Sequence, residues 1–322
     1  MMHNWKFAVL LALTLGGAAT IFVFLNRNNQ TEENELLAET KTAGFDGDRA
    51  IQYLDLLCKI GPRISGSDGM KAQQKLLKDH FEKFGAVVTF QKFDASQRSK
   101  VEKVEMTNMI ISWHPEMKKR ILICGHYDTR PIADQEPKKR DWYKPFVSAN
   151  DGTSTVAFMM EMAHSMKDLK PNVGVDFILF DGEEYIHNPV IDNYFFGSEY
   201  FANDYTKNPP KHVYVAGVLL DLFAANGATF RPEQNSKFLA GKVLEDLWNI
   251  AAELKIPRFE DGKGDNVSDD HIALNRAKIP TVDIIDLQYE HWHRLSDTPD
   301  KCSPSAMTDV AKVIIEWLKR LK

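Results

Sequence analysis

Acidic residues and histidines gather after the apolar, strand-like segments of this sequence. In chain order, the polar residues that end or follow four such segments are His126, Asp128, Glu183, Glu184, Asp221 and His293. Another acid, Asp151, stands just before a stretch of helical period. In an open α/β sheet the ligand site lies beyond the carboxyl ends of the strands. We therefore expect these side chains to meet at one edge of one sheet.

Together these residues offer many carboxylate oxygens and two imidazoles. Zinc binds that mixture, and its catalytic sites use three protein ligands and leave one position open for water or substrate. Iron and manganese are second choices, because the sequence lacks a closely spaced pattern of two histidines and one carboxylate. Glu183 and Glu184 are neighbours, so their side chains diverge in a loop. One of them can bind a metal while the other acts as a general acid or base.

Each of these residues, taken alone, also has a simpler interpretation. Asp151 can cap the helix that follows it, and adjacent acids such as Glu183 and Glu184 often lie in a solvated loop. His293 can be an ordinary surface or core histidine. Asp221 is harder to explain in this way, because an unpaired carboxylate beside an apolar strand is costly to bury.

Apolar segments of strand length alternate with segments of helical period over most of the chain. The predicted strands are 87–93, 108–113, 121–124, 176–180, 213–220 and 281–285. The predicted helices are 49–60, 69–84, 153–166, 237–254 and 305–321. This alternation is typical of an α/β domain with helices on both faces of its sheet. No internal repeat or second shift in composition divides the segment, so we expect a single domain.

The start of the chain differs from this domain. Residues 7–25 carry no charge, and as a helix they would be roughly 28 Å long, close to the hydrocarbon thickness of a bilayer. We expect residues 1–27 to be a membrane anchor or signal segment, and residues 28–45 to be a polar tether. No small-residue cleavage site follows the apolar stretch, which favours a retained signal anchor over a cleaved signal peptide and over a core helix. The catalytic domain would then lie outside the cytoplasm, in the periplasm of a bacterium, or be secreted if the segment is cleaved.

Composition excludes several other classes. The 45 acidic and 40 basic residues give a formal net charge of -5, and no long basic run is present, so we expect no nucleic-acid partner. The three cysteines, Cys58, Cys124 and Cys302, are too few and too far apart for a disulfide scaffold or a zinc knuckle. A disulfide between two of them stays open.

The order and approximate spacing of the motifs resemble the zinc-dependent aminopeptidase superfamily over most of the chain after Asp46. The matching motifs are His126-x-Asp128, Asn150-Asp151-Gly152, Asp181-Gly182-Glu183-Glu184, Asp221 and Trp292-His293. Within that superfamily the chain looks most like the glutaminyl-peptide cyclotransferases, or glutaminyl cyclases. Two positions separate the branches: Asp269 stands where the peptidases usually carry serine, and Trp292 stands where they commonly carry tyrosine.

The resemblance implies a single-domain, three-layer α/β/α fold around a mixed, mostly parallel twisted sheet, with the catalytic domain at residues 46–322. It implies an aminoacyltransferase that converts the N-terminal glutamine of peptides or proteins to pyroglutamate and releases ammonia. One zinc ion per chain and a monomeric catalytic domain are expected.

The resemblance also implies a role for each motif residue. Zinc ligands would be Asp151, Glu184 and His293, and Glu183 would be the general acid/base. Asp221 and Asp269 would form a hydrogen-bonded acid network with Glu183. In the dinuclear peptidases, the positions of His126 and Asp128 help to bind or orient a second metal. Trp292 would form an apolar wall for the glutamine side chain, with core packing as the alternative.

Two other functions remain open from the sequence. A dinuclear zinc aminopeptidase would use the same ligand positions, and an anchored, non-enzymatic binding module would carry a degenerate site. The chain also departs from the animal cyclases, which place a second pocket tryptophan shortly after the Glu-Glu pair. Residues 185–190 contain none, so substrate contacts on that side of the site must differ.

Overall fold

The chain divides into two units, Met1–Ala43 and Gly44–Lys322. The computed structural model describes residues 44–166, 168–169 and 171–321, which belong to the second unit. At the centre of this unit lies a six-stranded sheet in the order β1-β2-β4-β3-β5-β6. The strands are β1 (Val87–Ala95), β2 (Val104–Trp113), β3 (Lys119–His126), β4 (Gly174–Phe180), β5 (Val213–Asp221) and β6 (Thr281–Ile285). The β1-β2-β4 pairs are antiparallel and the β4-β3-β5-β6 pairs are parallel.

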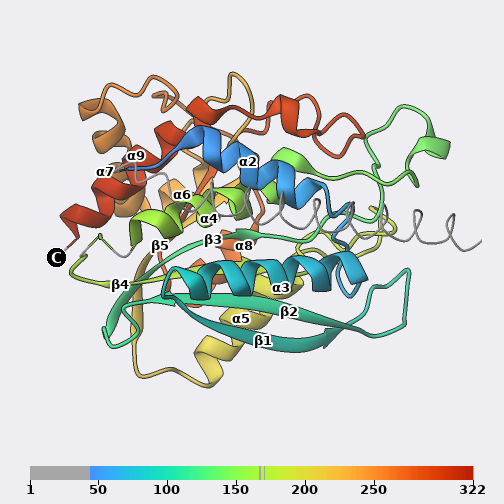
Figure 1. The fold of residues 1–322 in the computed structure, drawn as a ribbon, viewed down its shortest axis with the longest axis horizontal. Coiled ribbons are helices and arrows are strands. Elements are labelled where there is room, and N and C mark those ends of the chain that lie inside the picture. Colours follow the sequence, from blue (N-terminus) through green and yellow to red (C-terminus); the bar gives the residue numbers. More distant parts are fainter. Residues whose placement is uncertain (1–43, 167, 170, 322) are drawn as a thin grey trace, which may run out of the picture. The chain divides into compact units, whose positions relative to one another are not determined.

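Helices lie on both sides of this sheet (Figure 1). The α-helices are α2 (Gly47–Cys58), α3 (Asp68–Lys83), α4 (Ser154–Met166), α5 (Phe196–Lys207), α6 (Gln234–Leu239), α7 (Gly241–Glu253), α8 (Asp270–Arg276) and α9 (Pro304–Arg320). Three short turns of helix complete the set: η1 (Lys139–Asp141), η2 (Ala149–Thr153) and η3 (Pro299–Lys301).

Each face of the sheet has its own apolar core, because successive side chains of a strand point to opposite sides. In β3, Ile121 and Ile123 pack into the larger core, which α2, α3, α4, α7 and α9 cover. Leu122 and Cys124 pack into a smaller core with Phe201 of α5. Strands covered on both faces are continuously apolar, and all seven residues of β4 are buried. The predicted three-layer α/β/α fold with a mixed, mostly parallel sheet is confirmed.

The predicted elements agree with this fold, with three exceptions. All six predicted strands are present, and four of the five predicted helices correspond to α2, α3, α4 and α9. The helix predicted at 237–254 is instead two helices, α6 and α7, which meet at Ala240, where φ is -136° and ψ is 31°. Helices α5 and α8 were not predicted.

The predictions for the N-terminal segment concern residues that the structure mostly does not describe. The anchor or signal segment at 1–27 and the tether at 28–45 lie outside the described residues, apart from Gly44 and Phe45. Among the described residues, no helix combines the length and apolar character needed to cross a bilayer. The three cysteines are buried and form no disulfide.

Candidate active site

The parallel strands explain why the polar motifs converge. Strand β3 lies between β4 and β5, and its last residue, His126, is paired with Phe180 at the end of β4. The segment after β4 therefore brings Glu183 to one side of His126, and the end of β5 brings Asp221 to the other. His126 Nδ1 lies 3.9 Å from Glu183 Oε2, and His126 Nε2 lies 3.5 Å from Asp221 Oδ1. The fold thus brings these side chains together at one edge of the sheet, as predicted.

Asp151 reaches this edge from the tight η2 turn that begins α4. The next residue, Gly152, has φ of 74°, a left-handed conformation that favours glycine. A Cβ atom at position 152 would lie 2.6 Å from Cε1 of His126, so only glycine lets the turn approach the imidazole. Asp297 holds the turn from the other side, because its carboxylate accepts hydrogen bonds from the backbone N–H groups of Asn150 (2.9 Å) and Asp151 (3.2 Å).

His293 arrives from the loop that follows β6. Its backbone φ of 53° is left-handed, which is rare for a residue with a side chain and is typical of functional sites. Its Nε2 atom lies 3.1 Å from Glu184 Oε2 and 3.6 Å from Asp151 Oδ2. The three predicted zinc ligands thus lie close together, because this one nitrogen is near a carboxylate oxygen of each of the two acids.

The arrangement fits a zinc ion. Asp151 Oδ2 and Glu184 Oε2 are buried and have no hydrogen-bond partner among the described residues. His126, Asp151 and Glu184 each offer a ligand atom within 4.8 Å of the others. Imidazole nitrogens and carboxylate oxygens are ligands that zinc binds in catalytic centres. His126, predicted to bind or orient a second metal, thus lies next to the candidate ligands Asp151 and Glu184.

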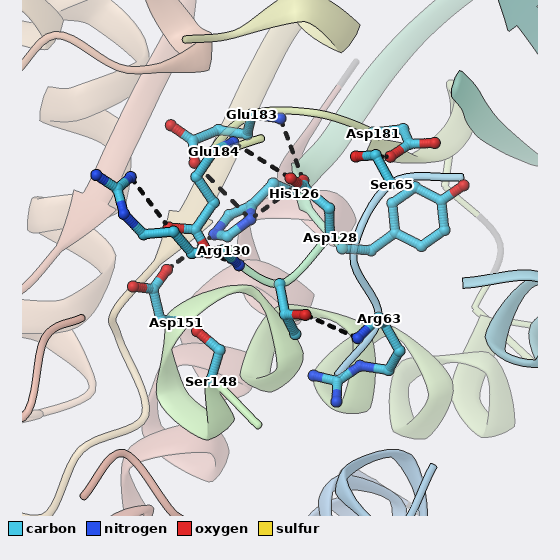
Figure 2. A network of polar contacts seen from close by, with 12 residues as sticks. Arg63, Ser65, His126, Asp128, Arg130, Ser148, Asp151, Asp181, Glu183 and Glu184 are labelled. Atoms are coloured by element: carbon cyan, nitrogen blue, oxygen red, sulfur yellow. Dashed lines mark hydrogen bonds and ion pairs between the residues drawn. The ribbon is translucent and has the colours of Figure 1, made fainter. Parts of the chain in front are cut away.

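Asp128 holds the backbone of the two glutamates, and both of its carboxylate oxygens are used in doing so. Its two carboxylate oxygens accept hydrogen bonds from the backbone N–H groups of Glu183 (3.1 Å) and Glu184 (3.3 Å). Its Oδ1 also lies 3.6 Å from His126 Nδ1. Figure 2 shows Asp128 between the histidine and the Glu183-Glu184 turn. These contacts favour the orienting role among the two predicted for Asp128.

The two glutamates differ in how deeply their side chains are buried. The side chain of Glu184 is 1% exposed, and its Oε1 accepts a hydrogen bond from the backbone N–H of Arg130 at 2.9 Å. The side chain of Glu183 is 13% exposed, so it remains accessible from the site. Burial, and then the charge of Asp151, raise the pKa of Glu184 to about 7. Burial also raises the pKa of Glu183 well above its ordinary value, and the charges of Glu184 and Asp269 act in the same direction.

A group of acids, Asp221, Asp269 and Asp270, lies near Glu183. Asp221 ends β5, and Asp269 caps α8 by accepting a hydrogen bond from the backbone N–H of Asp270 at 2.5 Å. Burial, followed by the charges of Asp221 and Asp270, raises the pKa of Asp269 well above its ordinary range. Burial likewise raises the pKa of Asp221 and brings that of Asp270 to about 7. Carboxylates that lie this close oppose one another's ionisation, which adds to the effect of burial on these pKa values.

Trp292 borders the site. It is 38% exposed, and its ring centroid lies 4.1 Å from that of His293. A partly exposed tryptophan beside the candidate ligand His293 is consistent with the predicted wall for a substrate side chain, and its exposure argues against simple core packing.

Several buried polar residues at the site were not identified from the sequence. Besides Asp297, they are Arg130, Glu233, His271 and Asp283, together with Asp134, whose side chain is 6% exposed. Asp283 had a detectable signal, because it is an acid within the apolar strand segment TVDII. His271 is fully buried between Glu233 and Asp283, with Nε2 3.3 Å from Glu233 Oε2 and Nδ1 3.8 Å from Asp283 Oδ2. The positions of the others depend on contacts between distant segments, which no local pattern marks.

Comparison with known proteins agrees with this geometry. Residues 108–318 match the sequence profile of peptidase family M28. The chain belongs to this family.

Solved structures related to the chain include both cyclases and peptidases. A glutaminyl cyclase from Fimbriiglobus ruber is 50% identical, with a TM-score of 0.85 over 88% of this chain and 98% of that one. A glutaminyl cyclase from Bacteroides thetaiotaomicron, bound to N-acetylhistamine, is 30% identical, with a TM-score of 0.81 over 87% and 99% of the two chains. A leucine aminopeptidase precursor from the same organism is also 30% identical, with a TM-score of 0.81 over 87% and 98%.

A curated relative is the glutaminyl-peptide cyclotransferase of Bos taurus, 25% identical over 237 residues. That match spans 65% of this chain and 64% of the bovine enzyme, so somewhat less than two thirds of that relative is covered. The resemblance inferred from the motifs is confirmed.

Proposed function

We propose that this chain is a zinc-dependent glutaminyl-peptide cyclotransferase, which closes the N-terminal glutamine of a peptide or protein into pyroglutamate. The observation that carries the proposal is the group of acids, Asp221, Asp269 and Asp270, close to Glu183 and to the candidate ligands Asp151 and Glu184. The 50% identity to the Fimbriiglobus ruber glutaminyl cyclase supports the same chemistry. The runner-up is an aminopeptidase, which the likeness to a leucine aminopeptidase precursor favours.

The reaction is an internal aminolysis. The neutral α-amine of glutamine attacks its own γ-carbonyl carbon, a C–N bond closes the five-membered ring, and the bond to the side-chain nitrogen breaks to release ammonia. Attacking and leaving groups belong to one residue, so the protein need only hold them in a reactive arrangement and move a proton. Trp292 would supply the apolar wall against which the glutamine side chain lies.

Glu183 is the residue placed to move that proton. It would accept a proton from the attacking amine and deliver it to the departing nitrogen. The proton that Glu183 takes from the amine is the one that it gives to the leaving nitrogen, so Glu183 returns to its starting state. Asp221 and Asp269 would form a hydrogen-bonded acid network with it. Burial raises the pKa of Glu183 well above its ordinary value, which favours the protonated form that a proton carrier must adopt during the transfer.

Asp151, Glu184 and His293 would hold one zinc ion per chain. When bound, zinc supplies a Lewis acid that polarises the γ-carbonyl of glutamine. Asp128 and Asp297 would maintain this set, because each accepts two backbone hydrogen bonds from the turns that carry the acidic ligands.

Two measurements on the purified protein separate the candidate functions. Direct fluorophore release from Leu-linked or Gln-linked substrates, without a coupling enzyme, reports peptidase activity, whereas ammonia release from a Gln-linked substrate reports cyclisation. The proposal expects ammonia release and about one zinc per chain. Fluorophore release with two zinc ions per chain would replace it with the dinuclear aminopeptidase, and absence of zinc and of both activities would favour a binding module.

The N-terminal segment suggests where the enzyme works. Its uncharged stretch at 7–25 supports a retained membrane anchor at 1–27, with the polar tether at 28–45 and the catalytic domain from residue 46 on the non-cytoplasmic side. A monomeric catalytic domain is part of this proposal. Fractionation of cells that express the full chain should place the protein in the membrane fraction and accessible to external protease. A shortened chain in the soluble exported fraction would instead indicate cleavage.

A further inference from the structure

Arg130 and Asp134 form a buried ion pair directly behind the candidate zinc ligands. Both lie in the segment that follows β3, four residues apart. Arg130 donates hydrogen bonds from Nε and Nη2 to the two carboxylate oxygens of Asp134, each at 2.9 Å. The Arg130 side chain is 1% exposed and that of Asp134 6%. A two-pronged contact of this kind fixes the orientation of the carboxylate as well as its position.

Asp134 touches one candidate ligand. Its Oδ1 lies 3.2 Å from Nδ1 of His293, on the side of the imidazole opposite Glu184 and Asp151. A carboxylate at that distance favours the tautomer with its proton on Nδ1. The lone pair of a neutral His293 then stays on Nε2, the nitrogen that lies 3.1 Å from Glu184 Oε2.

Arg130 touches a second candidate ligand. Its backbone N–H donates to Glu184 Oε1 at 2.9 Å, and its Nη1 lies 3.7 Å from Glu184 Oε2. Residues Arg130, Asp134, His293 and Glu184 therefore close a ring of contacts that passes through two ligands. Figure 2 shows Arg130 next to Glu184 and Asp151.

The same arginine also reaches the segment that leads from Glu184 to α5. Its Nη2 donates to the Tyr194 hydroxyl at 2.9 Å, and its guanidinium carbon lies 5.3 Å from the centre of the Tyr194 ring. The neighbouring residue, Phe195, donates its backbone N–H to the carbonyl of Glu183 at 2.9 Å. Arg130 thus contacts Glu184 and Tyr194, which lie before and after residues 185–190, where the chain departs from the animal cyclases.

We propose that Arg130 and Asp134 are a positioning pair, which fixes the tautomer of His293 and the carboxylate of Glu184 for zinc. This inference rests on the proposed function, since it concerns the same ion. Residues that orient metal ligands from behind typically contribute a factor of about 10 to 100 in metal affinity or activity. Both side chains are almost fully buried and contact the candidate ligands, so their loss should act through the metal.

The test compares Asp134→Asn and Arg130→Lys with the unchanged chain by zinc titration against a competing chelator. Asp134→Asn removes the charge that holds the Nδ1 proton, and Arg130→Lys keeps the charge but loses the two-pronged contact. We expect Asp134→Asn to bind zinc about 10- to 100-fold more weakly, and Arg130→Lys to lie between it and the unchanged chain. The absorption spectrum of the cobalt-loaded chain should shift in Asp134→Asn, because the ligand geometry changes.

The matched control is Asp141→Asn, which removes an acid from the same segment. Asp141 pairs at 2.7 Å with Lys144, whose side chain is 60% exposed, and zinc affinity should be unaffected by its loss. Zinc affinity and cobalt spectrum in Asp134→Asn equal to those of the control would overturn the proposal. If Asp134→Asn does not fold, Arg130→Lys decides in the same way. An unchanged chain that binds no zinc would refute the proposed function itself, which is a separate outcome.

Discussion

At the scale of single residues, the two adjacent glutamates have different surroundings in the site. Glu184 is buried, accepts a hydrogen bond from the backbone of Arg130 and lies 3.1 Å from the imidazole of His293. Glu183 is more exposed and faces the acid network. A single backbone turn, whose N–H groups both donate to Asp128, produces this division.

Glu183→Gln tests the proton-transfer role. Glutamine has nearly the same shape but cannot carry a proton between the amine and the leaving nitrogen, so turnover should fall by about 100-fold or more. Zinc content should stay at the level of the unchanged chain, because the candidate ligands Asp151, Glu184 and His293 are unchanged. Steady-state kinetics and metal analysis check both statements, and a fully active variant would remove Glu183 from the mechanism.

The sequence motifs mark the candidate ligands but not the residues that pack against them. The motifs that resemble a known family predict Asp151, Glu184 and His293 as zinc ligands, and the structure places these three side chains together. Arg130 and Asp134 could not be predicted in this way, since their importance depends on His293, which lies more than 150 residues later in the chain. Their spacing of four residues occurs in a loop, where it has no helical meaning.

At the scale of elements, the strands were predictable because burial on both faces makes them continuously apolar. Helix α5 was not, because three of its four buried residues, Gly197, Ser198 and Ala202, are small and give no apolar stripe. Helix α8 has only seven residues. The break between α6 and α7 lies at Ala240, a residue that favours helix, so tertiary packing overrides local preference there.

The η2 turn should be intolerant of any side chain at Gly152. Gly152→Ala would place a methyl group 2.6 Å from the His126 ring on a backbone with φ of 74°. We expect a loss of more than about 1 kcal/mol in the free energy of unfolding, together with weaker zinc binding. Denaturant unfolding and chelator competition measure the two effects. Gly241→Ala is the control, because a Cβ there meets no atom within 4 Å; equal stability of both variants would contradict the account.

Two histidines where α3 meets α4 should make stability depend on pH. Burial lowers the pKa of both His80 and His164 to about 4, below the value of about 6.5 in an unfolded chain. Between these values the unfolded chain binds more protons, so each histidine destabilises the fold as pH falls from about 6.5 to 4. Its contribution is fully favourable above pH 6.5.

His80→Gln isolates this effect. Buried acids such as Asp270, whose pKa burial raises to about 7, act in the opposite direction and are common to both chains. The measured quantity is therefore the difference in Tm between His80→Gln and the unchanged chain. We expect it to shift in favour of the variant as pH falls from 6.5 to 4. A difference that is constant over this range would show that His80 does not titrate as described.

At the scale of the whole molecule, a fold shared by cyclases and peptidases carries a group of acids and histidines that could hold a metal at one sheet edge. The relatives at 30% identity include both a glutaminyl cyclase and a leucine aminopeptidase precursor, so fold alone does not decide the reaction. The two reactions differ in the group that attacks. In a cyclase the substrate's own amine attacks and Glu183 transfers its proton, whereas in a peptidase water attacks the peptide bond.

Mass spectrometry of the product tests this central claim most directly. The zinc-loaded chain is incubated with a peptide that begins with glutamine, and the mass of the peptide is followed over time. The account predicts that the peptide loses one ammonia and keeps every residue. A peptide shortened by one residue, together with free glutamine, would contradict the account and identify the chain as an aminopeptidase.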